Sequence, residues 1–179
     1  YSPTGTLLIP EGVGYSVVDE VCGGDRLAPD YPARFRTPMF RDITFDDVSG
    51  LAWLVDGANL WTLDISDPVA PTRLALQALE GHPVAVHRVA STLWVAALDG
   101  GLRAYDIGTG GVALSASATV DFPGNQARVL DVDGSAGVLY AALGNHGLGV
   151  VALGPDGRAV GEPELVEASV GAGRRHGLH

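Results

Sequence analysis

The chain has 179 residues, of which 46% are hydrophobic and 18% charged. This composition excludes a disordered protein, because enough apolar side chains are present to form a core. The net charge of −10 argues against binding to nucleic acid, which requires Lys and Arg on phosphates, and against anionic membrane surfaces. The 25 glycines and 11 prolines break every apolar run, which indicates an all-β chain with frequent turns and no membrane-spanning helix.

The first 40 residues contain two short apolar stretches followed by a polar segment. Residues 6–9 and 15–18 predict two strands, since they are rich in β-branched and other apolar residues. Residues 23–38 are polar, contain three prolines and show no period, so we expect a loop there.

Three units of similar sequence follow. Their aromatic residues Trp53, Trp94 and Tyr140 are spaced by 41 and 46 residues, and a period of about 40–50 residues is typical of four-stranded β-propeller blades. Each unit predicts a short inner strand (42–45, 83–89 and 127–132), then a buried strand with the aromatic residue, a turn rich in Gly, Asp and Asn, and two further strands. The fourth strand of the first unit is expected at 72–78. A helix there is the competing interpretation, but the apolar runs are short and interrupted by Gly or Pro.

The first unit has a more specific pattern. It contains Gly50-Leu51-Ala52-Trp53-Leu54-Val55-Asp56-Gly57, then Leu60-Trp61-Thr62-Leu63-Asp64-Ile65-Ser66-Asp67-Pro68, and Ala70-Pro71-Thr72 directly after. This pattern resembles the LVIVD repeat family of β-propellers. The second unit keeps Tyr105-Asp106-Ile107, and the third keeps only Val151-Ala152-Leu153. The resemblance implies a secreted or cell-surface bacterial propeller and is nearly silent on activity.

The expected fold is therefore all-β: about three four-stranded blades plus an N-terminal pair of strands, in a ring that this chain leaves incomplete. The blades are expected at 41–80, 81–122 and 123–168. Residues 1–40 hold the strands and loop, which are candidates for part of a closing blade, and residues 169–179 begin a further blade or form a tail.

Three blades are too few for a closed ring, which uses about four to eight. Leu60 and Trp61 point to opposite faces of one strand, so apolar groups on both faces require two packing partners. An uncovered blade face would be prone to aggregation. We expect it to be covered by further sequence, by a second copy in a homodimer, or by a complementary propeller chain.

A candidate ligand site follows from propeller topology, because the loops between blades and those between the second and third strands surround the mouth of the central channel. Among the polar residues of these loops, six are the candidates: His82, Asn125, Asn145, His146, Arg174 and His176. Such residues are suited to bind a polar ligand or a metal. The competing interpretation is turn chemistry for Asn145 and a structural role for the histidines.

No motif supports a cofactor or a zinc site, and none is required by the sequence. Asp131-Val132-Asp133-Gly134-Ser135 resembles the start of a calcium loop, but the twelfth position is Ala142, which cannot bind the ion, so a tight hairpin turn is predicted instead. The expected function is a non-catalytic binding or scaffold module. The alternative is a propeller enzyme, a metal-dependent hydrolase or lyase, with its site at the channel mouth.

Overall fold

The computed structural model describes residues 7–11, 14–18, 40–46, 48–67, 71–122 and 129–167. Within these ranges the regular elements are fourteen β-strands and two single 3₁₀ turns, Thr109–Gly111 and Gly144–His146. β1 (Leu7–Glu11) and β2 (Gly14–Val18) form an antiparallel hairpin.

The other strands form three four-stranded antiparallel sheets, each in chain order, which we call the first, second and third blade. The first blade contains β3 (Asp42–Asp46), β4 (Leu51–Val55), β5 (Asn59–Asp64) and β6 (Thr72–Ala78). The second contains β7 (Pro83–Val89), β8 (Thr92–Ala97), β9 (Gly101–Ile107) and β10 (Ala113–Val120). The third contains β11 (Asp131–Ser135), β12 (Val138–Ala142), β13 (Leu148–Ala152) and β14 (Glu164–Val166).

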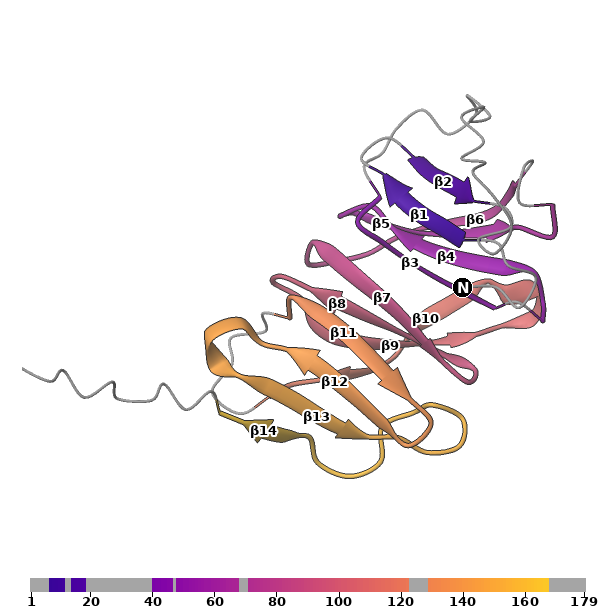
Figure 1. The fold of residues 1–179 in the computed structure, drawn as a ribbon. Helices are drawn as coiled ribbons and strands as arrows, with labels where there is room; N and C mark the ends of the chain where they lie inside the picture. Colours follow the sequence, from indigo (N-terminus) through magenta and orange to yellow (C-terminus); the bar gives the residue numbers. More distant parts are fainter. Residues whose placement is uncertain are drawn as a thin grey trace, which may run out of the picture.

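The three blades form an open arc (Figure 1). The first strands β3, β7 and β11 lie next to one another along its inner edge, and β1 lies beside β3 on the side of the first blade that faces away from the second. This confirms the predicted fold class, including the N-terminal strand pair and the incomplete ring.

Two hydrophobic cores hold the blades together. Trp53, Val55 and Leu60 of the first blade pack against the second blade's Val86, Leu93, Val95 and Tyr105. Trp94, Ala96 and Leu102 on the opposite face of the second blade pack against the third blade's Leu139, Ala141 and Val151. The second blade is therefore apolar on both faces, as its position between two neighbours requires.

The inner strand of the third blade differs from the prediction. It was expected at 127–132, with a turn over residues 131–135, whereas β11 runs from Asp131 to Ser135 and the turn falls at Ala136–Gly137. Gly137 has a φ of 97°, which suits the turn, while Gly134 pairs with Leu139 inside the hairpin. A Cβ at Gly134 would lie 2.9 Å from the Val138 carbonyl oxygen, so this glycine permits close strand contact and does not mark a turn. The strand predicted at 72–78 is confirmed by β6.

Candidate functional site: the blade joints and the open end face

The aromatic residue of the second strand joins one blade to the next. The indole Nε1 of Trp53 donates a hydrogen bond to the Gly111 carbonyl oxygen at 2.8 Å, and that of Trp94 donates to the Gly157 carbonyl oxygen at 2.9 Å. Both indoles are almost fully buried. The two tryptophans occupy the same register position, opposite Thr44 and His87 of their inner strands. The same joint is therefore made twice.

The two acceptor glycines are also equivalent. Gly111 and Gly157 follow the third strand of their blades and have φ values of 78° and 83°. A Cβ would lie 2.2 Å from Leu51 Cδ1 at Gly111, and 2.0 Å from the Val89 carbonyl oxygen at Gly157. Only glycine satisfies both the backbone conformation and the close contact with the preceding blade.

The sequence analysis did not single out these glycines and missed the joint. A signal was present in the spacing. Asp106 and Ala152 are the last residues of the third strands that pair with the second strands, and Gly111 and Gly157 each follow five residues later. The equivalent segment of the first blade falls at residues 68–70, which lie outside the described residues.

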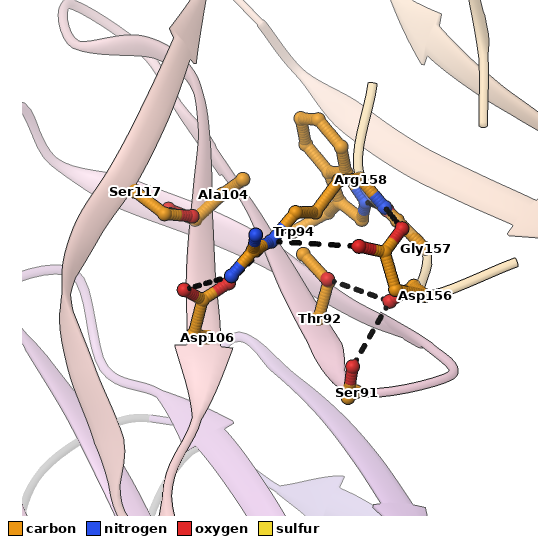
Figure 2. A network of polar contacts seen from close by, with 9 residues as sticks. All are labelled: Ser91, Thr92, Trp94, Ala104, Asp106, Ser117, Asp156, Gly157 and Arg158. Atoms are coloured by element: carbon orange, nitrogen blue, oxygen red, sulfur yellow. Dashed lines mark hydrogen bonds and ion pairs between the residues drawn. The ribbon is translucent and has the colours of Figure 1, made fainter. Parts of the chain in front are cut away.

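Polar contacts strengthen the second joint (Figure 2). The hydroxyls of Ser91 and Thr92 donate to the Asp156 carbonyl oxygen at 3.1 and 2.9 Å. Arg158 binds the Asp106 carboxylate through Nε and a terminal nitrogen at 3.0 and 2.5 Å, and this hydrogen bonding holds the pKa of Arg158 above its ordinary value. The ion pair is partly exposed, so it orients the β13–β14 connection more than it stabilises the fold.

The inner strands are joined by side chain to backbone contacts. Asp42 accepts hydrogen bonds from the Ile43 amide at Oδ1 and from the second blade's Val86 amide at Oδ2, both at 2.8 Å. Burial raises the pKa of Asp42, although these two hydrogen bonds act in the opposite direction. His87 Nε2 lies 2.8 Å from the Gly134 carbonyl oxygen and links the second blade to the third.

The far side of the third blade has no neighbouring blade among the described residues. Its exposed apolar side chains are Tyr140 at 43%, Leu148 at 39% and Val166 at 54%. The register places Tyr140 beside Val150, and Leu148 beside Val166, on one face of the sheet. We call this surface the end face.

Tyr140 corrects one expectation. It pairs with Asp133 at the same register position as the two tryptophans, but the strand that carries it is buried on one side only. The reason is that Leu139 and Ala141 face the second blade, whereas Tyr140 points away from it.

The outer side of the first blade, at the other end of the arc, is covered. Leu54 and Leu63 have no exposed surface, and the Trp61 ring meets Phe40 edge-on at 5.5 Å between centroids. The β1–β2 hairpin lies on this side (Figure 1). The arc therefore has one covered and one open end.

The residues predicted at the channel mouth are only partly brought together. His82 lies in the β6–β7 connection, and its Nδ1 is 2.8 Å from both carboxylate oxygens of Asp99 in the β8–β9 turn, so loops of these two kinds do share one edge. Asn145 and His146 are exposed in the β12–β13 connection and form no side-chain hydrogen bond with the other described residues. Asn125, Arg174 and His176 lie outside the described residues.

A cleft lies at the opposite ends of the strands from this mouth. It has a volume of about 630 Å³ and lies between the first two blades, with Leu51, Trp53 and Leu74 in its walls. Arg88 also lines it, with its guanidinium 3.2 Å from Asp46 and 5.9 Å from the centroid of the Trp53 ring. In the described part of the chain, no group of three or more His, Cys, Asp or Glu residues is arranged to hold a metal, and no helix is long and apolar enough to cross a membrane.

Repeated four-stranded blades with their inner strands side by side, joined through buried tryptophans, define an open section of a β-propeller. No protein-family model and no curated protein matches the sequence. Solved structures do match, at low sequence identity.

The chain is similar to a functionally unknown protein from Desulfotomaculum acetoxidans, with a TM-score of 0.62 and 15% identity over 93% of this chain and 59% of that one. It is similar to a 6-phosphogluconolactonase homologue from Bacteroides uniformis, with a TM-score of 0.61 and 16% identity over 89% of this chain and 54% of that one. It is also similar to the N-terminal domain of Nup159, with a TM-score of 0.58 and 12% identity over 94% of this chain and 43% of that one. These likenesses show the propeller fold, and the chain spans 43 to 59% of the length of these three structures.

Proposed function

We propose that this protein is a non-catalytic scaffold module, a section of a β-propeller that acts by binding a further protein surface at its end face. The observation that carries the proposal is the exposure of Tyr140, Leu148 and Val166 on a sheet whose opposite face is fully packed. A blade is built to bury both faces, so an exposed apolar face calls for a partner.

The apolar side chains of this surface supply part of the free energy that binding requires. Full burial of an exposed apolar side chain contributes about 1.5–3 kcal/mol, so three roughly half-exposed side chains contribute about 3 kcal/mol together. The neighbouring Val138 and Val150, which are partly buried, extend the apolar surface. This surface is a better candidate for function than the channel mouth, where His82 and Asp99 are both largely exposed and bind each other.

The experiment is a native mass measurement on the protein isolated from its source, with intact mass of every chain. We expect a species heavier than 18.5 kDa, either because a second chain is bound or because the chain is longer. Leu148→Lys on the end face should reduce the amount of any complex at least tenfold, because a buried lysine side chain must be desolvated.

Leu74→Lys is the matched control, since Leu74 is exposed to a similar extent, 45%, but lies on β6, the outermost strand of the first blade. It should leave the complex intact. A stable native species of 18.5 kDa, or equal effects of the two lysine substitutions, would overturn the proposal.

A further inference from the structure

We infer that the occupant of the end face is a further four-stranded blade of this same repeat, whose turn after the third strand carries a glycine with positive φ. This inference rests on the proposed function and names the partner surface. It follows from two unused groups on the third blade, Tyr140 and Asp131. The equivalents of Tyr140 in both preceding blades, and the equivalent of Asp131 in the first blade, bind the next blade.

Tyr140 is the first unused group. Trp53 and Trp94, at the equivalent register position, each donate to a glycine carbonyl oxygen of the next blade. The Tyr140 hydroxyl is also a hydrogen-bond donor at the end of an aromatic side chain, and it forms no hydrogen bond with the other described residues. A third glycine of this kind would satisfy it.

Asp131 is the second unused group. It corresponds in register to Asp42, because both lie two residues before the partner of the aromatic residue. Both carboxylates accept their own neighbour's amide at Oδ1, Ile43 at 2.8 Å and Val132 at 2.9 Å. Asp42 Oδ2 accepts the next blade's Val86 amide, whereas Asp131 Oδ2 has no hydrogen-bond partner among the described residues. The inner strand of an incoming blade would supply that amide.

A second copy of this chain fits less well than a different blade. Head-to-tail packing would need the outer face of the first blade, where Leu54 and Leu63 are already fully buried. Back-to-back packing of two end faces would bring together the carboxylates of Asp131, Asp133 and Glu164, and the four strands of the third blade contain no Lys or Arg to compensate them. The structure therefore favours a partner that presents the blade face equivalent to the one on which Val86 and Gly111 of the second blade contact the first blade.

The test uses the chain's own second blade as a probe of known geometry. A copy of residues 83–167 is appended to the full 179-residue chain, so that the only new joint is between the third blade and the copied second blade. Residues 167–179 then form the connection, which is close in length to the natural one between β10 and β11. We expect the Val86 amide of the copy to be protected from hydrogen exchange, and Asp131→Ala to reduce that protection at least tenfold.

Two further variants address the aromatic contact. Tyr140→Phe removes only the hydroxyl and should weaken docking of the copy about fivefold, as expected for the loss of one hydrogen bond, while leaving the melting temperature of the original chain unchanged. Gly111→Ala, made in the copy alone, should abolish docking. The inference is overturned if the copy exchanges freely, if these substitutions have no effect, or if the original chain forms a dimer through the end face.

The two proposals fail in different ways. If Leu148→Lys leaves the native complex unchanged, the end face is not the binding surface and the proposed function is wrong. If Leu148→Lys disrupts the complex but the appended blades do not dock, the surface binds a partner of another kind and only the present inference is wrong.

Discussion

The two ends of the arc belong to the same kind of sheet, yet one is covered and the other is open. On the outer side of the first blade, Leu54 and Leu63 are fully buried and Trp61 is 8% exposed. On the end face of the third blade, Leu148 and Tyr140 are about 40% exposed and Val166 is 54% exposed. The difference shows that each blade of this repeat has two apolar faces, and that structure outside the blade determines which of them is exposed.

The ends also present opposite sides of the repeat. Trp53 and Trp94 point toward the following blade, and Tyr140 lies on the same side of its own blade, so the end face is the side that a following blade would contact. The covered face of the first blade is the preceding side. The arc can therefore be extended in one direction without displacing the N-terminal hairpin.

The largest expected effect comes from one leucine at each end. Leu63→Ala should lower the free energy of unfolding by about 3 kcal/mol, because it leaves a cavity in a closed core. Leu148→Ala is the matched substitution on the third strand of the last blade and should cost less than about 1 kcal/mol, since its side chain already meets solvent. Urea denaturation of the two variants measures the difference. Similar losses would mean that the two faces are equally covered in solution.

Most of the fold could be predicted from the sequence because each repeat has a local pattern of short apolar runs separated by turn residues. The period of the aromatic residues gave the number of blades, and the apolar strand of residues 83–89 coincides with β7. The third inner strand was misplaced, because Asp133 and Gly134 have the composition of a turn. Their pairing with Tyr140 and Leu139 overrides that local preference.

The candidate site was harder to predict. Selection of the channel-mouth residues used a rule about loops, and the structure joins only His82 to a neighbour, Asp99. The joints depend on contacts over about 60 residues, such as Trp94 with Gly157. The spacing of each glycine from its third strand is a local pattern, but it does not show which tryptophan the glycine contacts. The exposure of Tyr140 could not be predicted either, because the sequence of β12 does not show whether another blade lies beside that strand.

A second prediction compares two glycines of the β13–β14 connection. Gly157 and Gly161 have nearly the same φ, 83° and 81°, but a Cβ at Gly157 would meet the second blade, whereas a Cβ at Gly161 would meet nothing within 4 Å. Gly161→Ala should cost about 1 kcal/mol, from backbone strain alone. Gly157→Ala should cost about 2 kcal/mol more, because the turn must move away from Val89 and lose the Trp94 hydrogen bond.

Thermal and urea unfolding of both variants, with tryptophan fluorescence as the probe of Trp94, tests this expectation. Equal destabilisation would show that strain in the turn, and not contact between blades, makes the glycine necessary. That outcome would also remove the basis for expecting a third glycine opposite Tyr140.

The smallest effect concerns pH and compares Asp42, inside the joint between the first two blades, with Asp56 at the end of β4. Burial raises the pKa of Asp42 above its ordinary value of 3.8. Below pH 3.8 the carboxyl is protonated in the folded and unfolded states alike, and its contribution to stability is fully present. As the pH rises through the folded pKa, the unfolded chain loses this proton more readily, so stability is lost.

Asp42→Asn should therefore remove a decline in stability on the alkaline side of pH 3.8, measured as the difference in unfolding free energy from the original protein at closely spaced pH values. Subtraction is necessary because the pKa of Asp56 is lowered: partial burial opposes this shift, but the hydrogen bonds from Trp61, Asn59 and Ala58 outweigh it. Asp56 therefore adds stability above pH 3.8 that is lost on acidification. Asp56→Asn is the comparison, because it should remove the opposite dependence, a loss of stability on acidification. An identical pH dependence for Asp42→Asn and Asp56→Asn would contradict the view that burial in the joint between blades determines how Asp42 titrates.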